Sequence, residues 1–374
     1  MKDGFRVIDA DRHVMEPEDL FERYLEPEFK GRVQIGSGRR ERLVDGRPVS
    51  DNVKAPSGGG MTLGQEYRAT YSDAVAADFD AASNLRDMDR EGVDVAVLFP
   101  TLGLYIMWAD FIEPRLSAAI CRAYNNWLAE YCSADRERLY GVMLLPLQDP
   151  RLACEELRRA SRELGLVGIF WRPNVLCGRT LASPDYFPVY ELAAELGVTV
   201  CIHEGARTVL PQAGSDRYSE LTRHAACHPL EQMLAVGNFC ADGVLERFPE
   251  LKVAHLEAGC GWLPFWLDRL DEHWERASDR VRTTKELPSS YFKRQCMIST
   301  EAGEEFVHDV IRHVGEDYLV MATDYPHPDA IGKFPDLTVG ALSGNDVLPA
   351  DVRRKILWDN PARLYGMKSL VASR

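Results

Sequence analysis

The stretch Val198-Thr199-Val200-Cys201-Ile202-His203 is a short apolar run that ends on a histidine. Continuous apolar runs of this length are typical of strands that are buried on both faces of a parallel sheet. Three other runs also close on residues that can bind a metal ion or carry a proton, namely Asp11 with His13, His255, and Asp324. If all four runs are strands of one parallel barrel, these side chains meet at the same end of it.

Eight such apolar runs alternate with longer amphipathic stretches that have helical periodicity. The runs cover residues 5–10, 93–99, 139–146, 166–171, 198–203, 251–256, 296–299 and 318–323. Eight alternating units favour a closed (β/α)8 TIM barrel of the α/β class over an open sheet. We therefore expect residues 1–374 to form a single barrel domain, with its catalytic groups at the C-terminal ends of the strands.

Residues 30–75 interrupt this alternation after the first strand. Within them, Arg42–Val49 carries an Asp-Gly pair that suits a tight hairpin turn, and Ser57–Gly60 follows as a glycine-rich loop. An insertion at this point lies over the barrel mouth. It is either a surface excursion or a lid over the active site, and we favour the lid.

Composition narrows the classes of function. The 374 residues carry a formal net charge of −14, which disfavours nucleic-acid binding. No apolar run is long enough to cross a membrane, and the N-terminus has no apolar signal core, so we expect a cytoplasmic protein. The nine cysteines are scattered without a Cys-x-x-Cys pair, which excludes a zinc ribbon and a disulfide framework.

The strand ends supply candidate metal ligands. Asp11 and His13 are two residues apart, so in a strand both side chains face the same side and can bind one cation. His203 and Asp324 end later strands and complete the candidate metal site. Asp324 can also accept a proton, although it could instead cap a helix. His255 is the candidate general acid or base, with further metal ligation as its alternative.

Five further residues are candidates for substrate binding. Arg172 suits capture of a carboxylate and Trp171 could form a wall of the pocket. Glu16 could reach the metal or cap a helix, and His228 and His327 could contact substrate. Purely structural roles are the alternative for each: a salt bridge for Arg172, packing for Trp171 and a position behind the pocket for His228.

These motifs carry a resemblance to a known family. Ile8-Asp9-Ala10-Asp11-Arg12-His13 is similar to the Ile-Asp-x-His-x-His opening of the amidohydrolase superfamily, in the amidohydrolase-related branch typified by aminocarboxymuconate-semialdehyde decarboxylase. His203, His255 with Gly259-Cys260-Gly261, Asp324-Tyr325-Pro326 and the ending Asn360–Gly366 resemble its later motifs in the same order. The departure is Asp11, where a typical member has histidine.

The resemblance implies one divalent ion, zinc first and manganese second, bound by Asp11, His13, His203 and Asp324, with His255 as the acid/base. An acidic ligand at Asp11 raises the chance of manganese. The leading hypothesis is a metal-dependent non-oxidative decarboxylase of a small carboxylated aromatic or unsaturated acid. A metal-dependent hydrolase of an amide, lactone or related bond is the alternative, a hydratase a third possibility and a noncatalytic scaffold a remote one. Family habit also predicts a homodimer, with Leu263–Trp274 as a candidate interface.

Overall fold

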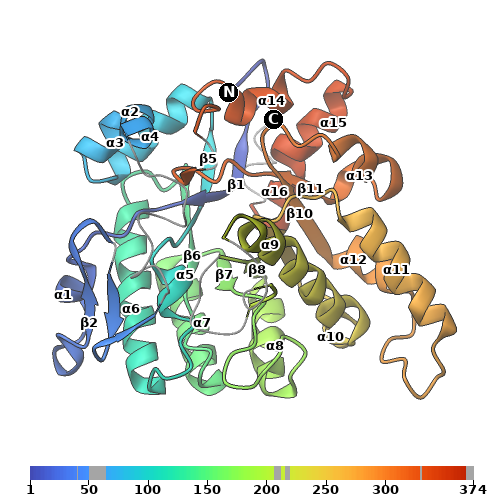
Figure 1. Ribbon diagram of the computed structural model, residues 1–374, viewed down its shortest axis with the longest axis horizontal. Helices are drawn as coiled ribbons and strands as arrows, with labels where there is room; N and C mark the ends of the chain where they lie inside the picture. Colours follow the sequence, from blue (N-terminus) through green and yellow to red (C-terminus); the bar gives the residue numbers. More distant parts are fainter. Residues whose placement is uncertain (40, 50–64, 206–211, 215–219, 329–330, 368–374) are drawn as a thin grey trace.

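Eight parallel strands form one sheet in which each strand pairs with its neighbours in chain order (Figure 1). The computed structural model describes residues 1–39, 41–49, 65–205, 212–214, 220–328 and 331–367. The strands are β1 (Ile8–His13), β5 (Val95–Phe99), β6 (Leu139–Met143), β7 (Gly168–Trp171), β8 (Thr199–His203), β9 (Val253–Leu256), β10 (Cys296–Thr300) and β11 (Leu319–Met321). Every predicted apolar run overlaps one of them, so the predicted barrel is confirmed.

Backbone hydrogen bonds join the two ends of this sheet at the mouth. The amide of His13 donates to the carbonyl of Tyr325 at 2.6 Å, and the amide of Asp324 donates to the carbonyl of Asp11 at 3.1 Å. The segment after β11 therefore lies against β1, which brings the first and last candidate ligands together.

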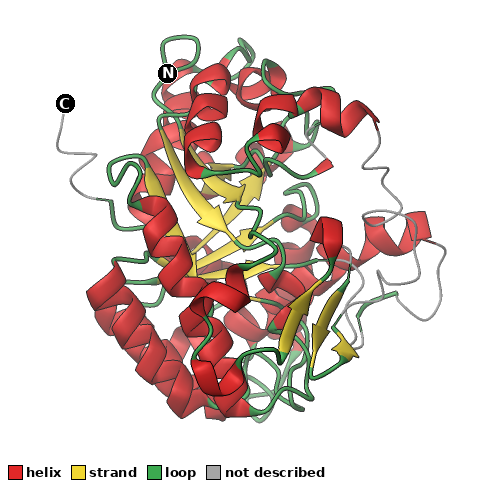
Figure 2. Cartoon of the chain, turned by 90° about the vertical axis from the view of Figure 1, so that its left-hand side faces the viewer, coloured by secondary structure: helices red, strands yellow, loops and turns green. Residues whose placement is uncertain are grey.

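Helices surround the strands, as Figure 2 shows. The main ones are α4 (Ala81–Glu91), α6 (Pro114–Cys132), α7 (Pro150–Leu164), α8 (Phe187–Leu196), α9 (Glu220–Val236), α11 (Leu263–Arg276), α12 (Pro288–Gln295) and α13 (Val307–His313). Local sequence explains their ends. Asp80 caps α4 by accepting from the amide of Ser83 at 2.7 Å, and Gly92 ends it with a φ of 84°.

Helix α9 contains a proline in its interior. It includes Glu220 and continues through Pro229. His224 and His228 are therefore neighbours on one helix, with ring centroids 5.0 Å apart.

The insertion after β1 contains a small antiparallel sheet of β2 (Val33–Ile35), β3 (Arg42–Val44) and β4 (Arg47–Pro48). The predicted hairpin is confirmed: Asp45 and Gly46 form its turn with φ values of 51° and 71°. Helices α2 (Gln65–Thr70) and α3 (Ser72–Ala76) follow. The predicted loop Ser57–Gly60 lies outside the described residues.

The C-terminal segment packs against the opposite end of the barrel from the mouth. Helix α16 (Asn360–Leu364) places the side-chain amide of Asn360 on the carbonyl of Leu319 at 2.8 Å. Just beyond it, the hydroxyl of Tyr365 donates to the carbonyl of Ala10 at 2.8 Å. These bonds link the segment to β11 and β1.

Candidate metal centre and active site

A β-bulge in β1 directs the first two candidate ligands into the barrel. Asp9 pairs with Ala96 and Arg12 with Leu98, so Ala10 and Asp11 together oppose a single residue of β5. A bulge of this kind re-aims side chains and is frequent beside active sites. Asp11 and His13 both face the interior, whereas Asp9 accepts from the amide of Thr323 at 3.0 Å and lies behind them.

Two imidazoles face each other at the centre of the site. The Nδ1 atom of His13 lies 2.9 Å from the carbonyl of Pro100, and Nδ1 of His203 lies 2.7 Å from the carbonyl of Glu204. A carbonyl only accepts, so each Nδ1 carries the proton and each Nε2 presents a lone pair. The two Nε2 atoms are 3.1 Å apart. Burial lowers the pKa of His203 to about 3, which keeps its Nε2 unprotonated.

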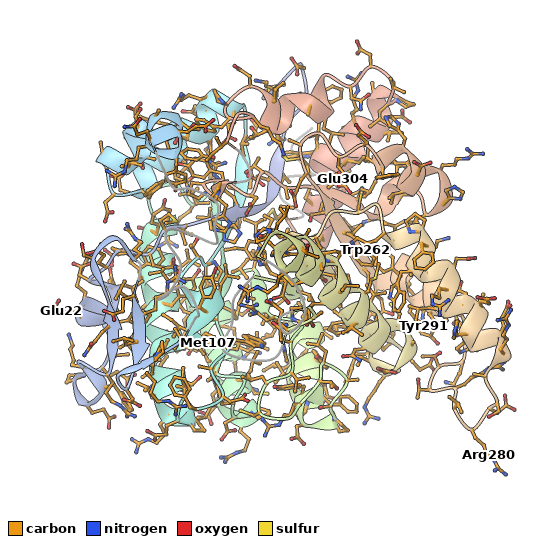
Figure 3. The ribbon with its side chains drawn as sticks, in the orientation of Figure 1. Glu22, Met107, Trp262, Arg280, Tyr291 and Glu304 are labelled. Atoms are coloured by element: carbon orange, nitrogen blue, oxygen red, sulfur yellow. The ribbon has the colours of Figure 1, made fainter. Side chains whose placement is uncertain are left out.

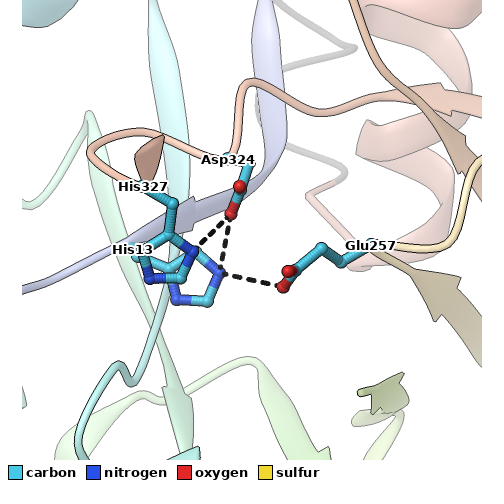
Figure 4. Close-up of side chains that lie close together, drawn as sticks. All are labelled: His13, Glu257, Asp324 and His327. Carbon is cyan, nitrogen blue, oxygen red and sulfur yellow. Dashed lines mark hydrogen bonds and ion pairs between the residues drawn. The ribbon is translucent and has the colours of Figure 1, made fainter. Parts of the chain in front are cut away.

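Carboxylates surround the Nε2 atoms of these two imidazoles. Asp11 has one oxygen 3.5 Å from Nε2 of His13 and the other 3.5 Å from Nε2 of His203. Figure 4 shows the contact of Asp324 with His13, in which Oδ1 of Asp324 is 3.4 Å from Nε2 of His13. Ligand atoms about 2.0–2.2 Å from one ion lie roughly 3.0–3.5 Å from each other. The predicted ligands therefore come together at distances that fit one divalent cation.

The state of Asp11 also fits a bound cation. Its side chain is buried, and neither of its oxygens has a hydrogen-bond partner among the described residues. Burial, and then the nearby charges of Glu257 and Asp324, raise its pKa well above the usual range. A buried carboxylate without donors is costly unless a cation compensates it.

A third carboxylate, from Glu257, joins this centre and was not predicted as a ligand. Its Oε2 atom is 2.8 Å from Nε2 of His203 and 4.0 Å from Nε2 of His13. A φ of 48° at Glu257 turns the chain after β9 and brings the side chain into the mouth (Figure 4). Its place two residues after His255 was visible in the sequence, but that backbone turn was not.

Two of the predicted pocket histidines border the centre. Nδ1 of His327 is 2.7 Å from Oδ1 of Asp324, and its ring packs on His13 with centroids 4.0 Å apart. Nε2 of His228 is 3.6 Å from Oε1 of Glu257. Both imidazoles therefore lie beside the candidate ligands.

His255, the predicted acid/base, lies elsewhere. In the β8–β9 ladder it pairs with Ile202 rather than with His203, so its ring leaves the sheet on the opposite face. Its Nδ1 is 2.8 Å from Oε1 of Gln232, and its ring stacks on Phe292 with centroids 5.9 Å apart. This position between barrel and helices does not suit direct proton transfer at the mouth.

Arg172 and Trp171 are also placed away from the expected substrate contacts. The guanidinium of Arg172 is buried and donates to Asn174, Glu204 and the backbone carbonyls of Leu104 and Gly205. Trp171, like His255, pairs with Ile202 in its ladder. Its ring packs on Tyr186 and Tyr190, with centroids 4.8 and 5.3 Å away. Both geometries correspond to the structural alternatives.

Glu16 is occupied by the backbone after β5. Its carboxylate accepts from the amides of Thr101, Leu102 and Gly103 at 2.9–3.2 Å, at the start of α5 (Gly103–Ile106). Of its two expected roles, the structure therefore shows the helix cap.

The glycines after β9 serve a packing role. The carboxylate of Glu304 accepts from the amides of Cys260 and Gly261 at 2.5 and 2.9 Å, and a side chain at Gly259 would come within 3.1 Å of it. Figure 3 labels Glu304 and Trp262, which follows this turn. The close approach that these glycines permit is made by Glu304.

The fold and these distances define a class of protein. A parallel (β/α)8 barrel whose mouth gathers two imidazoles and several carboxylates around one point is a mononuclear metal-dependent barrel enzyme.

The comparisons make this class more specific. The chain belongs to the amidohydrolase family, whose model matches residues 8–367. It is 28% identical over 282 residues to 2-amino-3-carboxymuconate-6-semialdehyde decarboxylase of Dictyostelium discoideum, covering 72% of this chain and 76% of that protein. The predicted membership of an enzyme family is confirmed.

Solved structures share the fold. The 5-carboxyvanillate decarboxylase of Sphingomonas paucimobilis has a TM-score of 0.71 at 21% identity, covering 97% of this chain and 99% of that one. A dihydroxybenzoic acid decarboxylase of Polaromonas sp., solved with manganese and the inhibitor 2-nitroresorcinol, has a TM-score of 0.65 at 20% identity, covering 97% and 98%.

Proposed function

We propose that this protein is a metal-dependent non-oxidative decarboxylase of a small carboxylated aromatic or unsaturated acid. The observation that carries the proposal is the pair of Nε2 lone pairs of His13 and His203, 3.1 Å apart and flanked by buried carboxylates. The relatives and structural neighbours named above support it, because their names describe decarboxylases of such acids.

In this proposal Asp11, His13, His203 and Asp324 hold the ion. When bound, the ion would act as a Lewis acid toward the substrate's carboxylate and a neighbouring oxygen. Asp324, protonated before this step, would deliver that proton to the carbon whose bond to the departing CO₂ breaks, and it would then regain a proton from solvent. The nearby imidazole of His327 orients Asp324. His327 and His228 contact the anionic substrate from the rim.

The identity of the ion follows from its donors. Zinc was the first expectation from sequence, with manganese next. The site combines two imidazoles with carboxylates. Carboxylate oxygens are ligands that suit manganese, whereas a site made of thiolates would favour softer ions such as zinc. We therefore propose one divalent ion per chain, with manganese at least as well suited as zinc.

The test combines metal analysis with a substrate screen. Wild-type protein, Asp324→Asn and His203→Ala are loaded with manganese or zinc and offered 2,6-dihydroxybenzoate and 5-carboxyvanillate, together with amide and lactone substrates. We expect CO₂ release by the wild type only. Hydrolysis without CO₂ release would favour the alternative hydrolase, and absence of metal binding by the wild type would overturn both.

We also propose that the insertion acts as a lid. Its hairpin packs beside α5, where the guanidinium of Arg42 lies 4.3 Å from the ring of Tyr105. Its later part reaches the segment after β11, where Tyr71 packs on Tyr325 with ring centroids 5.3 Å apart. The insertion is therefore anchored on two sides of the mouth. Proteolysis within the insertion, residues 30–75, should be slowed by a bound substrate analogue if the insertion closes over that analogue.

A homodimer is proposed on the face formed by α9 and α11. Leu234 is 56% exposed on α9 and Phe265 is 62% exposed on α11, and the indole of Trp266 joins the two helices by donating to the carbonyl of Met233 at 2.8 Å. Light scattering should give twice the chain mass, and Phe265→Glu should shift the mass toward that of the monomer.

Among the described residues no helix could span a membrane. All nine cysteines are free, and we propose a cytoplasmic location because free thiols persist in a reducing compartment.

A further inference from the structure

The carboxylate of Glu257 lies between the metal centre and His228. Its Oε2 atom is 2.8 Å from Nε2 of His203, while Oε1 is 3.6 Å from Nε2 of His228. The side chain is mostly buried, at 16% relative exposure. Glu257 thus places one oxygen at the point where the two metal-site imidazoles converge.

The contact with His203 needs a positive charge between its two atoms. Nδ1 of His203 carries the ring proton because it donates to the carbonyl of Glu204, so Nε2 is an acceptor. A carboxylate oxygen is also an acceptor. Two acceptors 2.8 Å apart repel each other unless they share a proton or both bind the same cation.

The same condition applies to His13 and His203, whose Nε2 atoms are 3.1 Å apart. One ion can satisfy both contacts, because Oε2 of Glu257 lies 2.8 Å from Nε2 of His203 and 4.0 Å from Nε2 of His13, and these two nitrogens are 3.1 Å apart. A single cation next to both imidazoles is therefore also next to Oε2 of Glu257.

We propose that Glu257 is a fifth protein ligand of the metal ion, added to Asp11, His13, His203 and Asp324. This inference rests on the metal centre of the proposed function and deepens it. Two imidazoles and three carboxylates exceed the three protein ligands and one open position common at catalytic zinc. They suit an ion of higher coordination number with a preference for oxygen, such as manganese.

The test measures manganese affinity of the full-length protein by the electron paramagnetic resonance signal of free Mn²⁺. Glu257→Gln keeps the shape of the side chain and removes its charge. The matched control is Glu301→Gln, since the charge of Glu301 also raises the pKa of Asp11 but its side chain is not in the ligand group. We expect Glu257→Gln to raise the Kd for Mn²⁺ at least about 100-fold. Loss of a residue that only hydrogen-bonds to a metal ligand raises it about 10- to 100-fold, so a larger effect indicates direct ligation. Glu301→Gln should raise it less than about 10-fold.

The spectrum of bound Mn²⁺ should also change in Glu257→Gln and remain that of the wild type in Glu301→Gln. Equal Kd values and equal spectra for wild type and Glu257→Gln would overturn the inference. If Asp324→Asn and His203→Ala still lose the metal, the proposed function stands without it. If Glu257→Gln does not fold, a crystal structure of the manganese-loaded wild type decides. An ion farther than about 3 Å from both oxygens of Glu257 is not ligated by it.

Discussion

At the scale of single residues, Arg172 is a buried cation whose three guanidinium nitrogens each reach a protein acceptor, including the carboxylate of Glu204. Replacing it with methionine leaves Glu204 buried without its countercharge, which costs about 3–5 kcal/mol of stability. We expect Arg172→Met to lower the thermal midpoint strongly, and Glu204→Gln in the same chain to recover part of the loss. Calorimetry of the single and double variants measures this. A stable Arg172→Met protein with only a raised KM would instead assign Arg172 to the substrate.

His255 predicts a pH dependence of stability. Burial lowers its pKa to about 3, against about 6.5 in the unfolded chain. The unfolded chain binds a proton as the pH falls below 6.5, whereas the folded protein does not until about pH 3. Stability is therefore lost across this window, by roughly 1 kcal/mol per pH unit from this group.

The matched variant for this prediction is His255→Gln, which cannot titrate. We expect its free energy of unfolding, with metal bound, to fall less steeply between pH 6.5 and 4 than that of the wild type. Denaturant unfolding at several pH values measures the two slopes. Parallel slopes would show that His255 is not kept neutral by burial.

At the scale of elements, the carboxylate of Glu16 holds the start of α5. It accepts from three successive amides, 101–103, as an N-terminal cap would. We expect Glu16→Gln to retain one metal ion per chain and to lose about 1–2 kcal/mol of stability. Metal analysis and thermal unfolding of the same sample separate the two effects. Loss of metal at unchanged stability would return Glu16 to the metal site.

The strands were predictable from sequence because each overlaps an apolar run. The direction of each side chain was not, because strands buried on both faces show no alternation between polar and apolar residues. His255 and Leu256 are equally buried, so only the pairing of His255 with Ile202 reveals that the histidine faces the helices.

The candidate metal site was also predictable only in part. Asp11, His13, His203 and Asp324 were predicted because each stands at the end of its run. The approach of Glu257 depends on a left-handed backbone conformation after β9, with a φ of 48°. Glutamate rarely adopts that conformation, and its sequence neighbours do not encode it, so the structure was needed to place this side chain.

At the scale of the whole molecule, the barrel concentrates negative charge in its interior and depends on a cation to balance it. Asp11 has no hydrogen-bond partner among the described residues and faces the charges of Glu257 and Asp324. Without metal this arrangement opposes folding. A bound ion at a concentration 100 times its Kd stabilises the fold by about 2.7 kcal/mol.

Asp11→Asn separates these two effects. The amide removes one buried charge, so the metal-free variant should be more stable than the metal-free wild type by about 1–3 kcal/mol. The variant should also gain less than half as much stability from added manganese, because it has lost a charged ligand. Calorimetric scans of the wild type and of Asp11→Asn, each with a chelator and with manganese, give the four thermal midpoints. A wild-type midpoint that is the same with chelator and with manganese would mean that the gathered carboxylates are neutralised by protons rather than by an ion, and the metal centre would then have to be abandoned.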